Sequence, residues 1–297
     1  MPENPGQVTI TGASGFIGQA VAARFVEAGY TVRAVFRRAT PPDALKALAS
    51  PTCTLFRADL TSPRAAELAV GDSVGVVHLA GAVTDWGDRS MFYANNVQLT
   101  KNVLRAAKKA HATRFVYAGS IAVHGFGPHL RSTEAGPYYS PVNPYQHTKK
   151  QAERIVLSAD SGDSGDFTTI VLRPGNVTGK GDTTSLFPMF AAMAKGGLPY
   201  VARGYYRTCP IHVEDLADAF LAAYRVKRPE KRVFNVVDDE RVRWRDFLEY
   251  AAAALGISPP RLSFPRSVSR IAAGTLEKLY RAVGSKTGPS ITLYRVD

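Results

Sequence analysis

The stretch VTITGASGFIGQAVAARF, Val8–Phe25, determines the fold of this 297-residue chain. Four β-branched residues lead into a glycine-rich turn, and a helical pattern of apolar residues follows. Gly12 permits the tight turn, Gly15 lets the backbone approach a pyrophosphate, and Gly18 allows close packing of helix on sheet. Free N–H groups at the helix start bind phosphate. This context predicts a dinucleotide-binding site, with a purely structural turn as the alternative. The residues expected at the phosphates are Gly12, Ser14, Gly15, Phe16, Ile17 and Gly18.

Strand-like and helical segments alternate outward from this stretch. The strand-like runs lie at 7–11, 31–36, 73–81, 113–120, 167–176 and 232–237, and the helical patterns lie at 16–29 and 95–110. This rhythm predicts an α/β fold, a Rossmann-type doubly wound parallel sheet with helices on both faces. We expect residues 1–174 and 208–240 to form the NADP(H)-binding domain. Residues 175–207 and 241–297, which are rich in aromatic residues, Pro and Arg, are expected to form a smaller C-terminal substrate-binding cap.

The composition is that of an ordinary globular protein with a sizeable core, because 45% of the residues are hydrophobic. Two cysteines, Cys53 and Cys209, provide neither a disulfide framework nor a Cys-rich metal site, so we expect no metal and a cytoplasmic location. The N-terminus lacks a basic stretch followed by an apolar run, and no segment approaches about 18 consecutive apolar residues. These patterns predict neither a signal peptide nor a spanning helix.

The formal net charge of +12 favours anionic partners through the long-range field. The basic residues are scattered, without the spacing of a nucleic-acid recognition motif, so we expect a phosphate-bearing cofactor or an acidic small-molecule substrate and no nucleic acid. A solvated basic surface accounts for most of the excess.

The choice of cofactor depends on Arg37 and Arg38, which end the predicted strand at 31–36. A NAD-preferring fold usually offers Asp or Glu there to the ribose hydroxyls. Two guanidiniums suit a 2′-phosphate, because Arg holds phosphate in a forked geometry. We therefore expect NADP(H), with NAD(H) as the alternative. The other interpretation is that one or both arginines point into water.

Several ordered motifs extend over nearly the whole chain. They are TGASGFIG, ADL (58–60), HLAG (78–81), NVQLTKNVL, GSIAVHG, PYQHTK, LRPGNVTGKGD and IHVEDLADAF. In their order and spacing the chain resembles the extended short-chain dehydrogenase/reductase family, also called the NAD-dependent epimerase/dehydratase superfamily. The resemblance implies that Asp59 and Leu60 border the adenine and that Ala80 and Gly81 border the ribose and nicotinamide. It places Pro174, Asn176 and Val177 at the carboxamide end.

The same resemblance places catalytic roles on Ser120, Tyr145 and Lys149. Tyrosine has an ordinary pKa near ~10, so a nearby ammonium is needed to favour the phenolate. Lys149, four residues after Tyr145, supplies that charge and can hold the nicotinamide ribose, and both side chains share one helix face. Ser120 can hydrogen-bond the reacting oxygen while Tyr145 transfers the proton. Taken alone, Ser120 would be interpreted as a cap at a strand end.

The residues around this set narrow the reaction. By resemblance, dehydratases carry extra carboxylates just after the active-site Ser or Thr, but Ile121 and Ala122 stand there. The flanking sequences look like the branch of 3β-hydroxysteroid dehydrogenases and reductases of long-chain 2-alkyl-3-keto acids. We therefore expect a dehydrogenase or ketoreductase for a hydrophobic, sterol-like or long-chain, 3-hydroxy/3-keto substrate. The alternatives are a nucleotide-sugar 4-epimerase and a non-catalytic dinucleotide-sensing protein.

The cap and the flanking loops supply candidates for the substrate pocket. These are Trp86, Phe126, Tyr138, Phe187, Met189 and Tyr205, and at each position a core role is the alternative. His124, where the family often has Tyr, is expected to alter the pocket wall, whereas Leu99, where it often has Gly, is not expected to touch the proton-transfer groups.

The segment at 264–292 has the pattern of an amphipathic helix. One side carries Val268, Ile271, Ala272, Leu276, Leu279, Tyr280 and Val283, with Arg270, Lys278 and Arg281 outside it. Such a helix either forms a hydrophobic lid that contacts a membrane peripherally or packs against the cap. Family members normally continue beyond PSIT (289–292), so a truncated C-terminus is expected. The resemblance also implies a homodimer through helices of the sheet domain.

Overall fold

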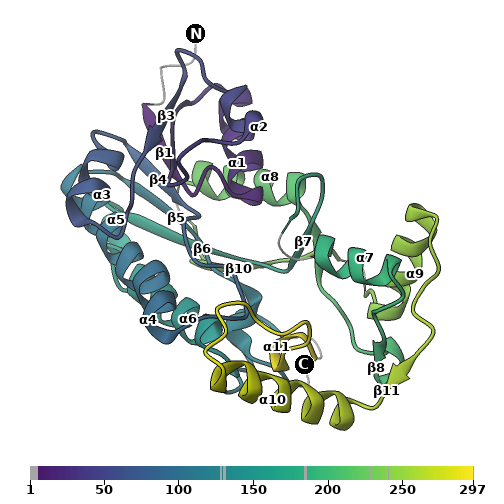
Figure 1. The fold of residues 1–297 in the computed structure, drawn as a ribbon. Helices are drawn as coiled ribbons and strands as arrows, with labels where there is room; N and C mark the ends of the chain where they lie inside the picture. The colour runs from purple at the N-terminus through teal and green to yellow at the C-terminus, as the bar shows by residue number, and fades with distance from the viewer. Residues whose placement is uncertain are drawn as a thin grey trace.

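A seven-stranded parallel sheet forms the centre of the computed structural model, which describes residues 6–127, 129, 132–183, 186–227, 229–239 and 241–296. The strand order is β10-β6-β5-β4-β1-β2-β3, and every neighbouring pair is parallel (Figure 1). The strands are β1 Gln7–Thr11, β2 Thr31–Phe36, β3 Cys53–Arg57, β4 Gly75–His78, β5 Arg114–Ala118, β6 Thr168–Pro174 and β10 Val233–Val236. The predicted doubly wound parallel sheet is confirmed.

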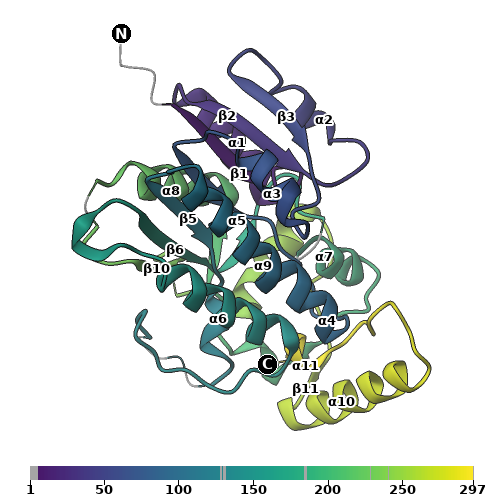
Figure 2. The same cartoon turned by 90° about the vertical axis from the view of Figure 1, so that its left-hand side faces the viewer.

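Helices cover both faces of the sheet, which is why its strands are almost continuously apolar. The helices of this layer are α1 Phe16–Glu27, α2 Asp43–Lys46, α3 Pro63–Val70, α4 Arg89–Phe92, α5 Leu99–Lys109, α6 Pro144–Leu157 and α8 Val213–Arg225, with short helices η1 Tyr93–Gln98, η2 Ile121–His124 and η3 Gly162–Ser164. Phe25 of α1 and Phe220 of α8 are buried on one face. Val103 of α5 and Val156 of α6 are buried on the other, and Figure 2 shows α5 and α6 in front of the sheet.

The C-terminal part of the chain surrounds the carboxyl ends of the strands with smaller elements. These are β7 Asn176–Thr178, α7 Leu186–Ala194, β8 Tyr200–Val201, η4 Ala202–Gly204, β9 Pro210–His212, α9 Trp244–Leu255, β11 Ser263–Phe264, α10 Arg266–Ala282 and α11 Leu293–Val296. Strand β7 pairs with β9 and β8 pairs with β11. Helices α7 and α9 share a separate apolar cluster that includes Met193 and Leu248.

Helix α10 lies at the lower edge of the molecule in Figure 1, below α11. None of the helices in the described ranges is both long enough and apolar enough to span a bilayer.

Candidate active site

The turn between β1 and α1 presents bare backbone at the carboxyl end of the sheet. Gly12 has a φ of +71°, and a Cβ on Gly18 would lie 2.1 Å from the carbonyl oxygen of Gly12, so neither position tolerates a side chain easily. Gly15 is exposed, and no hydrogen bond from a described side chain caps the start of α1. The first N–H groups of α1 are therefore available to an anion. This glycine cradle fits the pyrophosphate of a dinucleotide.

A buried chain of hydrogen bonds fixes the backbone beside this turn. The Nδ1 and Nε2 atoms of His78 lie 2.7 Å from Thr11 Oγ1 and 3.0 Å from Thr100 Oγ1. Thr100 donates its hydroxyl proton to the Asn96 carbonyl, so its oxygen accepts from Nε2 of His78, and Nδ1 accepts from Thr11. Burial, with Lys149 nearby, lowers the pKa of His78 to about 3 and keeps the ring neutral. Thr11 Oγ1 also accepts the backbone N–H of Ala80.

The residues predicted near the adenosine lie at the ends of β2 and β3. Both Arg37 and Arg38 are exposed, and Arg37 donates to Asn95 Oδ1 at 2.9 Å. Asp59 accepts hydrogen bonds from the backbone N–H and the hydroxyl of Thr61 at 3.0 and 2.8 Å. These bonds, with a contribution from Arg37, lower the pKa of the Asp59 carboxyl. The next residue, Leu60, is buried.

The remaining predicted cofactor residues lie where the chain leaves the sheet. Asn176 donates to Thr208 Oγ1 at 2.7 Å through its side chain and to the Cys209 carbonyl at 2.7 Å through its backbone. These bonds tie β7 to the segment before β9, and Val177 is buried. Pro174 closes β6 beside β10. Gly81 lies against Asn96 Oδ1, which accepts the Ala82 N–H at 2.7 Å.

The structure brings Ser120, Tyr145 and Lys149 together. Asn143 caps α6 by accepting the Gln146 N–H at 3.0 Å, so Tyr145 and Lys149 lie one turn apart at the start of the helix. Their side chains are buried, with 8% and 6% exposed. Ser120 follows β5 and hydrogen-bonds the Tyr145 phenol. It also accepts the Ala122 N–H at 3.2 Å, so the capping role and the functional position occur together.

Burial dominates the electrostatics of the pair. It raises the pKa of the Tyr145 phenol, and the Ser120 hydrogen bond opposes this shift. Burial lowers the pKa of Lys149 to about 8, and Glu153 one turn further along α6 opposes that. The Lys149 ammonium donates to the Ala118 carbonyl at 2.5 Å and lies 4.8 Å from the centre of the Tyr117 ring. Burial and the Ser120 hydrogen bond account for the shift in the pKa of Tyr145, so the expected effect of the Lys149 ammonium on this phenol stays a prediction.

A buried ion pair joins α6 to β6. Arg173 donates to both Glu153 oxygens, at 2.5 and 2.9 Å, and donates to the Tyr138 hydroxyl at 2.9 Å. His124 stacks on the Tyr138 ring at 4.8 Å and lies 3.2 Å from the Arg173 guanidinium. His124 and Tyr138 thus belong to this polar network. These contacts are with Arg173 and with each other, and they give no support to the substrate-pocket roles expected for His124 and Tyr138.

Comparison with known proteins identifies the family. The model of the NAD dependent epimerase/dehydratase family matches residues 8–236. The chain belongs to this family. It is 27% identical over 297 residues to a 2-alkyl-3-oxoalkanoate reductase of Shewanella oneidensis, covering 96% of this chain and 75% of the relative. It is 31% identical over 278 residues to the 4-hydroxy-2-methyl-3-oxo-4-farnesyl-3,4-dihydroquinoline-1-oxide ketoreductase of Stigmatella aurantiaca, covering 92% of this chain and 80% of the relative.

A solved structure of the protein MoeE5 in complex with UDP-glucose and NAD is also similar. It is 26% identical, with a TM-score of 0.73 over 88% of this chain and 85% of that one. The predicted family and its reductase branch are confirmed, and the chain is an enzyme, an NAD-dependent oxidoreductase of this family.

The C-terminal segment covers Tyr145, which the sequence did not predict. The Tyr294 ring lies edge-on to Tyr145 with centroids 6.2 Å apart and edge-on to Phe126 at 5.3 Å. Asp85 holds this segment, because it accepts a hydrogen bond from Thr292 at 2.7 Å and pairs with Arg295 at 2.8 Å. Local sequence patterns carry no signal for these contacts, which join residues more than 140 positions apart.

The other pocket candidates are dispersed. Trp86 lies under the end of α10, where its indole donates to the Ser285 carbonyl at 3.2 Å and Arg281 lies 4.5 Å from the ring. Met189 packs in the cluster between α7 and α9. Tyr205 is exposed, and Arg243 lies over its ring. Among the six candidates, Phe126 is the one whose described ring contacts join it to the aromatic cover over Tyr145.

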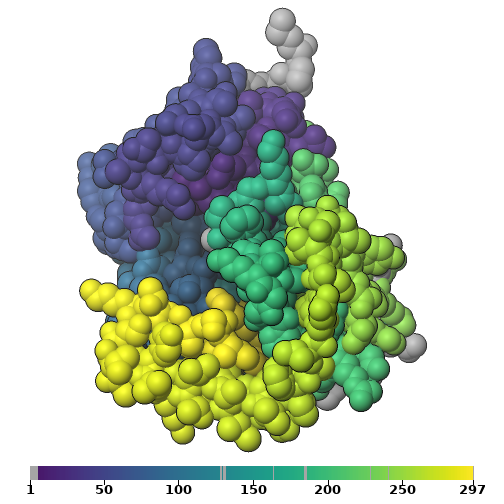
Figure 3. All heavy atoms as spheres, turned by 45° about the vertical axis from the view of Figure 1, so that its right-hand side comes forward, coloured from purple at the N-terminus to yellow at the C-terminus, as the bar shows by residue number. Residues whose placement is uncertain are grey.

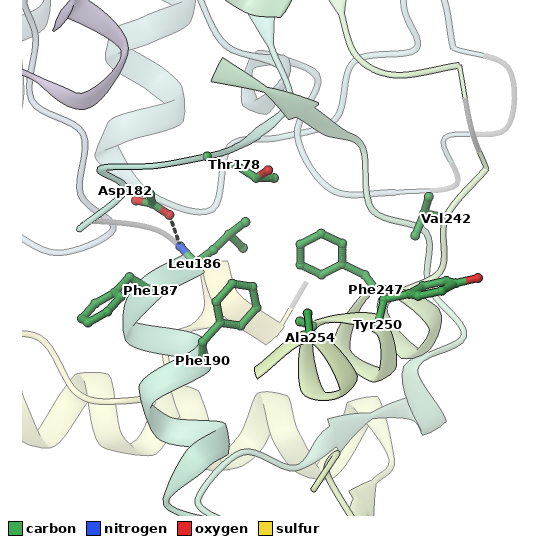
Figure 4. Close-up of a pocket in the computed structure, with 11 residues that line it drawn as sticks. Thr178, Asp182, Leu186, Phe187, Phe190, Val242, Phe247, Tyr250 and Ala254 are labelled. Atoms are coloured by element: carbon green, nitrogen blue, oxygen red, sulfur yellow. Dashed lines mark hydrogen bonds between the residues drawn. The ribbon is translucent and has the colours of Figure 1, made fainter. Parts of the chain in front are cut away.

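A mainly apolar cavity of about 490 Å³ lies between α7 and α9 (Figure 4). Phe190 and Phe247 both line it, and their stacked rings have centroids 6.1 Å apart. Phe187 also lines it. Asp182, which also lines the cavity, accepts the Leu186 N–H at 2.7 Å and so caps α7. Figure 3 shows a hollow between the purple and blue N-terminal part and the yellow C-terminal segment.

Replacing Lys149 should reveal the energetic penalty of its burial. The folded pKa of about 8 lies below the ordinary lysine value of 10.5, so the unfolded chain binds the proton more tightly. Wild-type stability should therefore rise as the pH increases from about 8 to about 10.5. Lys149→Met should be more stable than wild type at neutral pH by about 1–3 kcal/mol, and this advantage should shrink at high pH.

Denaturant unfolding of both proteins at neutral and high pH measures this difference. Lys150→Met, at the partly exposed neighbouring position, is the control. If the free energies of unfolding of wild type and Lys149→Met changed with pH in parallel, the lowered pKa of Lys149 would be contradicted.

Proposed function

We propose that this enzyme is an NADP(H)-preferring dehydrogenase or ketoreductase that interconverts a secondary alcohol and a ketone on a hydrophobic 3-hydroxy/3-keto substrate. The observation that carries the proposal is the buried set of Ser120, Tyr145 and Lys149 beneath an aromatic cover. Phe92 and Tyr294 both pack against the Tyr145 ring, with centroids 6.4 and 6.2 Å away. Such a surrounding favours an apolar substrate.

Tyr145 is the group that exchanges a proton with the substrate oxygen. Its phenol donates the proton when a ketone is reduced, and the phenolate accepts it when an alcohol is oxidised. Ser120, already hydrogen-bonded to this phenol, is placed to donate to the same substrate oxygen and stabilise its negative charge. A bound nicotinamide supplies or accepts the hydride at the substrate carbon.

Lys149 stabilises the phenolate and holds the cofactor ribose. Its ammonium lies against the carboxyl end of β5. Its bond to the Ala118 carbonyl occupies one of the three ammonium N–H groups and orients the other two. The turn at Gly12–Gly18 holds the pyrophosphate, and Arg37 with Arg38 holds a 2′-phosphate. Residues 1–174 and 208–240 thus bind the dinucleotide, and residues 175–207 and 241–297 bind the substrate.

The cavity between α7 and α9 supports the choice of an apolar substrate. Phe187, Phe190 and Phe247 line the cavity. Thr178 also lines it and directly follows Val177, which we assign to the cofactor. We assign this cavity to the alkyl portion of the substrate. The named substrates of the two curated relatives, a 2-alkyl-3-oxoalkanoate and a farnesylated 3-oxo compound, agree with that assignment.

A nucleotide-sugar 4-epimerase is the second candidate. The similar structure solved with UDP-glucose and NAD favours it, because an epimerase needs the same three catalytic residues. Purified enzyme should be offered 2-alkyl-3-oxo acids, 3-keto steroids and UDP-glucose while nicotinamide absorbance and sugar epimerisation are followed. Turnover of the apolar ketones supports the proposal. Conversion of UDP-glucose without any ketone reduction would replace it by the epimerase.

Tyr145→Phe should lower kcat for the active ketone by about 10²–10⁴-fold, because the proton donor is lost. Cofactor affinity, measured by nicotinamide fluorescence, should stay within about twofold, since the phosphate loop is untouched. Tyr30→Phe, between α1 and β2 at the amino end of the sheet, is the matched control and should keep full activity. Wild-type turnover by Tyr145→Phe would refute the role of the phenol.

Replacing Arg37 and Arg38 together by Ala should weaken NADPH binding by about 10- to 100-fold, because two charge-assisted contacts to the 2′-phosphate are lost. NADH binding should change little, and titrating both cofactors against both proteins separates the two effects. A wild-type protein that binds NADH more tightly than NADPH would contradict the NADP(H) preference.

Tyr294→Ala should widen the space beside Tyr145 and lower KM for ketones with bulkier substituents relative to small ones. Tyr294→Phe keeps the ring and should behave as wild type, which separates the steric effect from the hydroxyl. The ratio of kcat/KM for a bulky and a small ketone is the readout. An unchanged ratio in Tyr294→Ala would show that the ring does not bound the substrate.

A further inference from the structure

Helix α10 turns its apolar side away from the protein. The exposed side chains on this side are Val268 (50% exposed), Ile271 (71%), Leu279 (57%) and Val283 (70%). Figure 1 places the helix at the lower edge of the molecule, and in Figure 3 the yellow C-terminal segment forms the lower margin. The packing against the cap that was the alternative expectation is therefore wrong for these residues, whereas Leu276 and Tyr280 are partly buried.

The small and polar side of α10 faces inward. Ser269 and Ala273 are buried, and Glu277 accepts the Leu293 N–H at 2.8 Å from α11. Arg266 lies 5.6 Å from the centre of the Tyr206 ring. A helix at the surface of a globular protein normally has the reverse orientation, with its apolar stripe on the core. The inward contacts fix the orientation, so the outward apolar row is a built feature of the surface.

The apolar row continues into the segment before the helix. Leu262 is 65% exposed and Phe264 of β11 is 44% exposed. We call the four outward side chains of α10, together with the two exposed side chains in the segment that leads into it, the α10 face: Leu262, Phe264, Val268, Ile271, Leu279 and Val283. A contiguous exposed apolar surface on a soluble domain marks a site of contact.

Positive charge surrounds the α10 face. Residues 250–296 contain seven Lys or Arg and a single acidic residue, Glu277, so they carry half of the net charge of +12. Arg261, Lys278 and Lys286 are exposed beside the apolar row. A second copy of the chain would bring the same positive charge against this surface, which opposes self-association through it.

We propose that the α10 face docks on an anionic lipid bilayer. The helix lies in the plane of the interface, its apolar row enters the boundary between headgroups and acyl chains, and the flanking cations contact lipid phosphates. The chemistry that recognises the partner is an apolar layer beneath an anionic surface. Tyr206, whose ring lies beside Arg266 at the start of the helix, is a side chain of the type enriched at membrane interfaces.

Docking would also orient the active site. The turn after α10 holds Trp86, and α11 carries Tyr294 over Tyr145, so the cover of the active site is continuous with the docking helix. The inference goes beyond the proposed reaction and does not depend on it, because binding to lipid is measured without turnover.

Vesicle co-sedimentation of the full chain tests the proposal. Vesicles of phosphatidylcholine alone are compared with vesicles that also contain phosphatidylglycerol, at low and high salt. We expect binding to the anionic vesicles that is at least about tenfold tighter than to the neutral ones and that weakens with salt.

Three double variants, one of them a control, identify the surface. Ile271→Ser with Leu279→Ser should weaken binding by about tenfold or more, because two inserted side chains are lost. Leu68→Ser with Val226→Ser, at positions 50% and 43% exposed away from α10, is the matched control and should bind as wild type. Lys278→Gln with Lys286→Gln should reduce the preference for anionic vesicles. Unchanged thermal unfolding shows that the variants are folded.

Four results would overturn the proposal. They are no wild-type binding to either vesicle, equal binding to neutral and anionic vesicles, wild-type binding by Ile271→Ser with Leu279→Ser, and a dimer in solution that this double variant dissociates. The last result would show that the α10 face joins two copies of the chain.

Discussion

A buried lysine of α6, which donates to the last carbonyl of β5, is the group around which the rest of the candidate site is arranged. Taking an ammonium out of water is unfavourable unless other groups replace its hydration. Lys149 donates to the Ala118 carbonyl, lies over the Tyr117 ring, and has Glu153 one turn further along α6. Glu153 is held in turn by the buried Arg173. Strand β5, helix α6 and the ion pair between α6 and β6 therefore provide together the surroundings of this buried ammonium.

The cap completes this arrangement from the other side. Tyr294 and Phe126 form an aromatic cover whose position depends on Asp85, which binds both Thr292 and Arg295. The exclusion of water by this cover strengthens every electrostatic interaction beneath it. The same burial raises the pKa of Tyr145 above its ordinary value. Under the proposed function, a bound substrate displaces or adjusts this cover, and substrate choice then depends on residues far from Tyr145 in the sequence.

Local features were predictable from the sequence, and long-range ones were not. The strand, turn and helix of Val8–Phe25 follow from short-range rules, and so does the single helix face shared by Tyr145 and Lys149. The periodicity of residues 266–283 identified which side chains share one side of α10, but it could not tell which side faces water. Tyr138 was expected at the substrate because it is aromatic, yet its hydroxyl accepts from Arg173. Contacts such as Tyr294 with Tyr145 depend on tertiary packing that no local pattern encodes.

The most direct test of the proposed reaction follows one hydrogen atom. The enzyme should reduce a 2-alkyl-3-oxo acid with NADPH that carries deuterium at the transferred position of the nicotinamide, and mass spectrometry should locate the label in the product. The account predicts one deuterium on C3 of the resulting alcohol, with Tyr145→Phe strongly slowed. A product alcohol without deuterium at C3, or no alcohol at all while UDP-glucose is epimerised, would contradict it.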